Sequence, residues 1–227
     1  MMKKQILLFG ITLIFITTGL SGCTQQDSSS DQSTDQINLH ATESIQTILA
    51  KTETMESMYY EITSSINMPQ FGTQTAMIKI WQKKPYLKAQ TTSTVNGIIN
   101  TITVIQRPEG IYNYDYKEGK YVLTTDNTSF VESLQYFDNE MIKTYLNNQT
   151  STNLETEIID GKKTTIIQYT PPGDGNLMTI KIWIWNEKGV PLKATIDMTM
   201  EEITMMMDFI FSNYSFSEIP DSTFSVI

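Results

Sequence analysis

The sequence predicts an α+β fold that is mainly β, with a curled antiparallel sheet of about ten strands covering two helices. Three observations lead to this. From Tyr59 onward, apolar and polar residues alternate with a period of two over long stretches, as in half-buried strands. Pairs such as Asn96-Gly97 and Asp160-Gly161 separate the candidate strands and favour hairpin turns. Two other segments repeat apolar residues at helical spacing and can fill the concave face of a curled sheet.

The first 22 residues have the three-part layout of a secretory signal peptide. Lys3 and Lys4 form a basic head, and an apolar run follows from Ile6 to Ile16. This run is shorter than the ~20 residues of a membrane-spanning helix, which argues against the alternative of an uncleaved anchor. The end, Leu20-Ser21-Gly22-Cys23, resembles the lipobox of bacterial and archaeal lipoproteins. The resemblance implies cleavage between Gly22 and Cys23 and a diacylglyceryl-type lipid on Cys23.

Residues 23–40 are expected to form the lipid anchor and a disordered polar tether. Residues 24–38 are rich in Ser, Gln, Asp and Thr and contain no aromatic residue, so they cannot bury enough apolar area to order themselves. The folded domain, residues 41–227, is then held at a cell membrane and faces outside the cytoplasm, in a periplasm or at the cell surface. His40, the only histidine, lies at the edge of the tether, which argues against Ser-His-Asp and Cys-His catalysis.

The charge balance limits the partners. Removal of residues 1–22 takes away Lys3 and Lys4 and no acidic residue, so the formal net charge changes from −9 to −11. No basic stripe is present, which argues against nucleic acid as a partner. With this negative net charge, the domain is expected to be repelled by anionic lipid headgroups.

Within the domain, a first helix is predicted over 41–58, where Ile45, Ile48, Leu49, Met55 and Met58 recur at helical spacing. A second helix is predicted over 130–146. The apolar face of this second helix makes it a candidate plug for the sheet, formed by Phe130, Leu134, Phe137 and Met141. The predicted strands are 59–66, 73–83, 86–94, 98–106, 110–116, 120–125, 154–160, 163–170, 176–186, 191–200 and 203–216.

Several of these pieces, in their order along 41–227, resemble the LolA/LolB-like family of lipoprotein carriers and lipid-binding lipoproteins. The opening helix and strand at 45–66 are similar to the family's start. The segment 78–90, IKIWQKKPYLKAQ, resembles its strand that ends in an aromatic residue, a basic residue and Pro. Hairpins at 110–123 and 180–197 and the closing segment 211–226 follow in the family's order. The resemblance implies an incomplete β-barrel over helices, with an apolar cavity between them.

A methionine-rich hairpin is the candidate wall for an apolar ligand. Its inward positions would lie side by side across two strands, and methionine adapts to varied apolar shapes. An ordinary sheet core is the alternative, and Cu(I) binding by thioethers is a weaker one because no Met/His cluster is present. The candidate wall consists of Ile196, Met198, Met200, Met205, Met207, Phe209 and Phe211.

The remaining tryptophans, acidic residues and sequons do not indicate a catalytic site. Trp183 and Trp185 share one face of their strand, either as core or as an outer patch for a partner. The acidic residues are not spaced for acid/base catalysis or a calcium loop, so neither an enzyme, a metal site nor a cofactor is predicted. Asn127 and Asn148 stand in sequons that could be glycosylated if the source is archaeal.

The sequence therefore predicts an extracytoplasmic lipoprotein that binds an acyl chain, a lipid or a lipoprotein tail between sheet and helices, as a carrier or receptor. The alternative is an envelope sensor or structural module that binds a partner protein without a lipid ligand.

Overall fold

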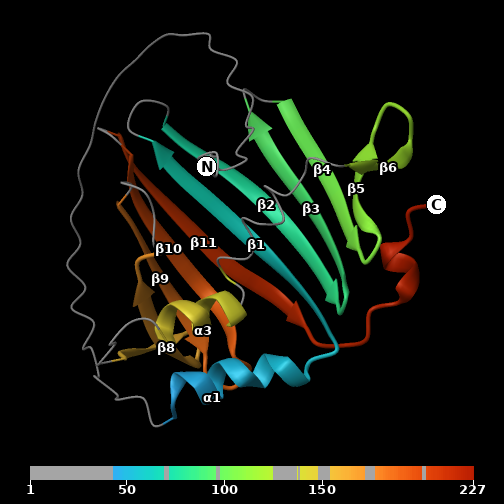
Figure 1. The fold of residues 1–227 in the computed structure, drawn as a ribbon. Coiled ribbons are helices and arrows are strands. Elements are labelled where there is room, and N and C mark those ends of the chain that lie inside the picture. The colour runs from blue at the N-terminus through green and yellow to red at the C-terminus, as the bar shows by residue number, and fades with distance from the viewer. Residues whose placement is uncertain are drawn as a thin grey trace, which may run out of the picture.

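The computed structural model describes residues 43–68, 72–95, 98–124, 137, 139–147, 154–171, 177–200 and 203–227. Over these residues the chain forms a single eleven-stranded antiparallel sheet with two α-helices, which confirms the predicted mainly β class (Figure 1). The helical elements are α1 (Ile45–Ala50), the 3₁₀ helix η1 (Lys51–Thr54), α3 (Asn139–Asn147) and the 3₁₀ helix η3 (Asp221–Phe224). The strands are β1 (Ser57–Met68), β2 (Gly72–Lys83), β3 (Tyr86–Val95), β4 (Ile98–Arg107), β5 (Gly110–Asp115), β6 (Lys120–Thr124), β7 (Thr156–Ile159), β8 (Lys162–Tyr169), β9 (Leu177–Trp185), β10 (Val190–Met200) and β11 (Ile203–Ser215).

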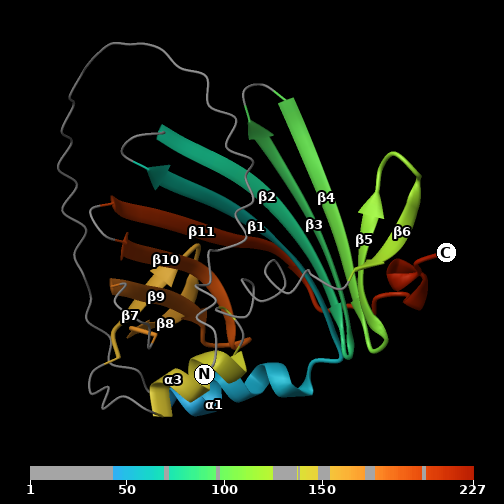
Figure 2. The same cartoon turned by 45° about the horizontal axis from the view of Figure 1, so that its top comes forward.

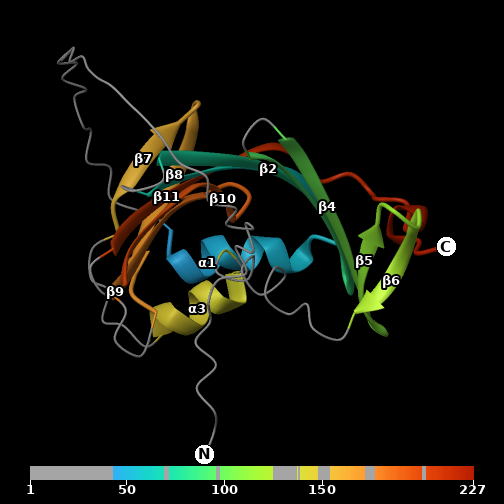
Figure 3. The ribbon, with the colours of Figure 1, turned by 90° about the horizontal axis from the view of Figure 1, so that it is seen from above.

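The sheet is made of two meanders that meet where the first and last strands pair. Its order is β6-β5-β4-β3-β2-β1-β11-β10-β9-β8-β7, so β1 beside β11 is the pairing between strands that are not consecutive. Figures 2 and 3 show the sheet arching over α1 and α3. Strand twist accumulates across so many strands and curls the sheet, but β6 and β7 remain edges. The result is the predicted incomplete barrel.

The main core lies between the concave face and the two helices. Alternate residues of β9 point inward, and Ile180, Ile182 and Ile184 have no exposed surface. From the helices, α1 contributes Ile48 and Leu49 to this core and α3 contributes Ile142 and Leu146. Complete burial of one such side chain contributes about 1.5–3 kcal/mol relative to exposure. None of the helices in the described ranges is long and apolar enough to span a membrane.

The first helix is shorter than predicted. It begins after Ser44, whose side-chain oxygen accepts from the Thr47 backbone N–H, and it ends at Ala50 before η1. The prediction of helix through residue 58 was wrong because β1 begins at Ser57 and pairs with β2 along its whole length. Ser57 Oγ also donates to the Ser217 carbonyl oxygen, which ties this end of β1 to the chain after β11.

A smaller core lies on the convex face, where the C-terminal segment covers the sheet near β5 (Figure 1). Ile219 and Phe224 pack there on Ile105 of β4, and Phe224 stacks on Tyr86 at 5.6 Å between ring centres. Lys83 holds the segment down through the Ile219 carbonyl oxygen at 3.1 Å and the Asp221 carboxylate at 2.6 Å. The C-terminal segment therefore closes one part of the outer face.

The turn between β9 and β10 touches α1 so closely that only glycine fits. Gly189 has a positive φ of 71°. A Cβ added at this position would lie 2.3 Å from the backbone oxygen of Ile48. The position of α1 on the sheet therefore depends on the absence of a side chain at residue 189.

We expect Gly189→Ala to lower the free energy of unfolding by at least about 2 kcal/mol, because it combines a left-handed backbone with a backbone clash. Gly119→Ala is the matched control, since Gly119 has a φ of 65° and open space around its added Cβ. The control should cost only the conformational strain of about 1 kcal/mol. Urea unfolding followed by circular dichroism measures both. Equal losses in the two variants would contradict the proposed close contact.

Candidate ligand cavity between the helices and the sheet

A cavity of about 340 Å³ lies where η1 and the start of α3 approach the end of the concave face. Strands β1, β2, β3, β4, β10 and β11 all contribute to it. Its apolar lining is contributed by Met55, Met58, Tyr60, Pro85, Leu87, Phe137, Val190, Pro191 and Tyr214. The sheet thus opens a space beside its core, in the position that the family resemblance implied.

Aromatic rings form the wall of the cavity on the side of the core. Tyr60 stacks on Tyr214 with ring centres 5.4 Å apart, and it also lies 6.2 Å from Phe211. Tyr214 donates its hydroxyl hydrogen bond to the Pro191 carbonyl oxygen. Burial raises the pKa of the Tyr214 hydroxyl well above its usual value, so this group stays neutral. The wall is therefore apolar in spite of its two tyrosines.

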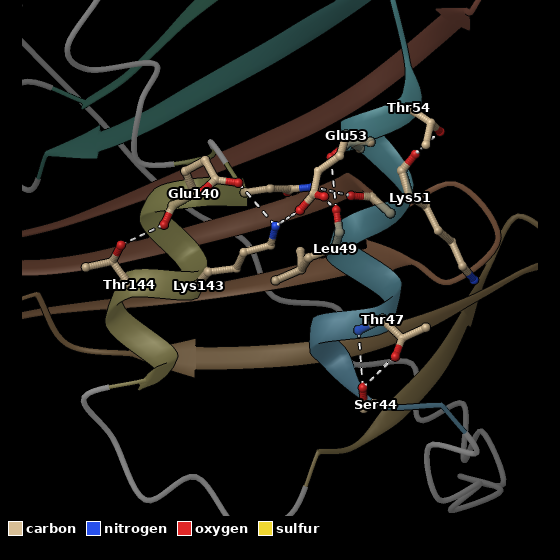
Figure 4. A network of polar contacts seen from close by, with 12 residues as sticks. Ser44, Thr47, Leu49, Lys51, Glu53, Thr54, Glu140, Lys143 and Thr144 are labelled. Carbon is tan, nitrogen blue, oxygen red and sulfur yellow. Dashed lines mark hydrogen bonds and ion pairs between the residues drawn. The ribbon is translucent and has the colours of Figure 1, made fainter.

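The rim of the cavity is polar. Glu53, Glu56, Glu140 and Lys84 line it. Lys143, on α3, forms ion pairs with Glu53 of η1 and with Glu140 at 3.1 Å, as Figure 4 shows. The hydrogen bond and the charge of Lys143 lower the pKa of the Glu53 carboxyl, so this carboxylate is ionised at neutral pH. Such exposed pairs contribute little to stability, yet they link the two helices at the rim.

Asn139 joins the three segments that frame the cavity. The two hydrogens of its side-chain amide Nδ2 are shared among three acceptors, the Leu49 carbonyl oxygen at 3.0 Å, Thr52 Oγ1 at 2.6 Å and the Gly189 carbonyl oxygen at 3.0 Å. These acceptors belong to α1, to η1 and to the β9–β10 turn. The start of α3 is thereby fixed to both the other helix and the sheet.

The predicted ligand wall lies on the concave face but does not line this cavity. Pairing of β10 with β11 places Ile196 opposite Met207 and Met198 opposite Met205, as expected for one continuous patch. The patch packs into the main core: Ile196, Met198, Met207 and Phe211 are buried, and Met205 and Phe209 pack against them. Met200 pairs with Ile203 at the end of the hairpin. The role of this whole patch as a ligand wall stays a prediction.

The predicted plug meets that wall. The Phe137 ring lies 4.9 Å from Phe209 and 5.3 Å from Phe211, and Phe137 also lines the cavity. Met141 is half-buried on α3. Phe130 and Leu134 lie outside the described residues, as do Cys23, Gly22, Asn127 and Asn148. Phe137 thus contacts both the cavity and the predicted ligand wall.

Sequence reasoning missed Leu87, Tyr214 and Asn139. In the segment 78–90, Lys88 lies on the outer face, 5.5 Å from the centre of the Trp81 ring. Burial lowers the pKa of its ammonium group. Alternation along β3 turns the neighbouring Leu87 inward, and this alternation was the available signal.

The two tryptophans of β9 lie on its outer face. Trp183 is buried there, and its indole Nε1 donates to the Glu157 carboxylate at 2.6 Å. Both faces of β9 are therefore covered in this region, as expected for a central strand. Within the described ranges, no group of three or more His, Cys, Asp or Glu residues is placed to hold a metal ion.

Comparison with known proteins finds similar folds among solved structures. A LolA superfamily protein of Nitrosomonas europaea is 11% identical, with a TM-score of 0.41, and the match covers 81% of this chain and 98% of that one. LprF of Mycobacterium bovis is 17% identical over 75% of this chain and 92% of its own, with a TM-score of 0.39. A chain of the MucA/MucB complex of Pseudomonas aeruginosa is 11% identical, with a TM-score of 0.40. That match covers 80% of this chain and 59% of the other.

The first of these structures carries the family name that the sequence motifs resemble. No protein-family model matches the chain, and no curated protein matches it. Likenesses at this level of identity concern the fold alone and do not extend to function.

We expect Asn139→Ala to lower the free energy of unfolding by about 2 kcal/mol, because buried carbonyl acceptors lose their donor. Thr144→Ala is the control on the same helix, since Thr144 is exposed and should change stability by about 0.5 kcal/mol or less. Urea unfolding measures the stability, and hydrogen exchange of the α3 amides measures local opening. A loss no larger than that of Thr144→Ala would show that Asn139 does not hold the helices.

Proposed function

We propose that this chain is an extracytoplasmic lipoprotein, anchored to a membrane through Cys23, that binds an acyl chain, a lipid or a lipoprotein tail as a carrier or receptor. The observation that carries the proposal is the cavity of about 340 Å³ between the helices and the sheet. Its volume is within the range of small-ligand pockets, ~300–1,000 Å³. An apolar wall with a polar rim suits a ligand that has an apolar chain and a polar end.

Burial would supply the binding energy. Each methylene group transferred from water into the apolar lining contributes about 0.8 kcal/mol. Tyr60, Leu87 and Phe137 present apolar surface to such a chain, and the polar groups of the rim can remain in contact with water. The mechanism needs no covalent chemistry, only a space that excludes water.

Movement of α3 would enlarge this space. Phe137 precedes α3 and packs on Phe209 and Phe211, so a shift of the helix would draw its ring away from the sheet. The cavity would then reach the methionine patch that includes Met205 and Met207, where flexible side chains can adapt to a longer chain. In this mechanism, the closed arrangement has a small cavity, and in the open arrangement the ligand also contacts the predicted wall.

Native mass spectrometry of protein purified from membranes tests the proposal. We expect lipid to co-purify with the wild type, and Leu87→Gln to reduce retention about tenfold because it puts an amide into the apolar lining. Leu123→Gln is the matched control, since Leu123 is 53% exposed. A second variant, Gln106→Leu, makes the lining more apolar and should raise retention. Circular dichroism confirms that each variant folds, and a wild type without lipid under every condition would contradict the proposal.

Exposed apolar side chains favour partner-protein binding as a second function. On the convex face, Met77 of β2 and Ile210 of β11 both pair with Thr63, and they are 45% and 47% exposed. Such a patch is typical of protein interfaces when it is contiguous. A partner cross-linked in cells that is lost in Met77→Ser but kept in Leu87→Gln would favour this function over lipid binding.

A further inference from the structure

Part of strand β4 forms an open edge within the sheet. β4 spans ten residues, but β5 pairs only with its last four, Val104–Arg107. Figures 1 and 2 show β5 and β6 diverging from the rest of β4. Tyr116, which follows β5, holds its hydroxyl 3.0 Å from Thr103 Oγ1, on the convex side where Ile105 also lies. Residues 98–103, which we call the β4 edge, therefore pair with β3 alone among the described strands.

The β4 edge carries exposed apolar side chains on both faces of the sheet. Because Ile105 lies on the convex face, alternation places Ile99 on that face and Ile98 and Ile102 on the concave face. The side chains of Ile98, Ile99 and Ile102 are 65%, 70% and 54% exposed. The other three residues of the segment are Asn and Thr, so it contains no charge, no proline and no glycine. An open edge of this composition pairs readily with another strand.

The two terminal strands of the sheet are better protected. β6 has five residues and begins with Lys120, and β7 has four residues and includes Glu157. Short length and charged side chains are the usual protection of a sheet edge against another chain. The β4 edge is longer than either terminal strand and has no charged residue, so it is the edge that calls for a partner strand.

The backbone of the β4 edge is oriented to receive such a strand. The turn between β4 and β5 has two residues, so the pair that closes it, Arg107 with Gly110, is joined by backbone hydrogen bonds. Every second residue before Arg107 directs its N–H and C=O to the same side of the strand. The backbone groups of Ile99 and Thr101 thus point away from β3 and toward the open side.

We propose that the β4 edge pairs antiparallel with the β4 edge of a second copy of this chain, around a two-fold axis at Asn100. In this register Ile99 lies opposite Thr101 of the partner subunit, so the outward backbone groups meet as hydrogen-bonded pairs. Ile98 lies opposite Ile102 of the partner subunit on the concave face, where each exposed side chain gains an apolar neighbour.

A second copy fits this edge better than other occupants. Two-fold pairing brings no like charges together because the segment has no charged residue. The same absence leaves no charged side chain by which a different protein would be selected. Pairing of the β4 edge with β7 of another copy would leave an edge free on each chain and add chains without limit, whereas the two-fold contact closes at two chains.

Disulfide cross-linking of the full-length protein in detergent tests the register. Asn100 would face Asn100 of the partner subunit in a non-hydrogen-bonded pair with Cα atoms about 4.5 Å apart, within reach of a disulfide. At about 0.1 mM chain, where weak dimers are populated, we expect Asn100→Cys to give roughly tenfold more linked dimer than the wild type. The wild type sets the background, since Cys23 is its one cysteine.

Ile99→Cys is the matched control, because Ile99 is 70% exposed and lies next to Asn100 in the strand. In the proposed register its thiol would have its counterpart about 8 Å away between Cα atoms, too far for a disulfide. Ile98→Cys and Ile102→Cys should each stay monomeric alone and should cross-link when the two chains are mixed.

A backbone variant tests the hydrogen bonds of the pairing. Added to Asn100→Cys, Thr101→Pro removes an N–H that faces the open side and should abolish the cross-link, whereas Thr101→Ala should keep it. Circular dichroism confirms that both variants fold, and the cysteine series stands without them. Equal cross-linking of Asn100→Cys and Ile99→Cys, or no cross-linking of Asn100→Cys above the wild type, would overturn the proposal.

Discussion

The amide of Asn139 and the bare Cα of Gly189 hold two short helices against one end of a curved sheet. Helix α1 has six residues and α3 has nine, too few for either to be stable by itself in water. Their position therefore depends on burial of residues such as Ile48 and Ile142 and on the hydrogen bonds of the Asn139 amide. Because this support acts at one end of the sheet, the ends of the helices leave a cavity instead of a filled core.

The contacts around this cavity differ in strength, and this difference suggests where it opens. The strands are joined by long ladders of hydrogen bonds, and the ladder between β1 and β2 runs without interruption. The helices are joined at the rim by exposed ion pairs of Lys143, which contribute little. Regions with few buried contacts open at lower free energy than the core. We therefore expect α3 to separate from the sheet at lower free energy than the paired strands separate from one another.

Much of the sheet could be predicted from the sequence because alternation of side chains is a direct consequence of strand geometry. The end of the first helix could not be predicted from the sequence. Met55 and Met58 continue the helical spacing, but the pairing of β1 with β2 imposes a strand from Ser57 onward. The register of β10 with β11 places Ile196 opposite Met207 and Met198 opposite Met205. Their role as a ligand wall stays a prediction. The sequence analysis assigned the ligand wall to β10 and β11, but of the described wall and plug residues only Phe137 lines the cavity. The lining depends on where Phe137 and Asn139 meet β3 and the β9–β10 turn. Those contacts join positions far apart in the chain and leave no periodic signal.

The turn between β9 and β10 makes contacts on both surfaces of the sheet. On its concave side, the Gly189 carbonyl oxygen accepts from Asn139, and Val190 and Pro191 line the cavity. On its convex side, Lys188 lies over the Trp185 ring. Because the same turn approaches Ile48 of α1 and accepts from Asn139 of α3, a displacement of the turn acts on both helices.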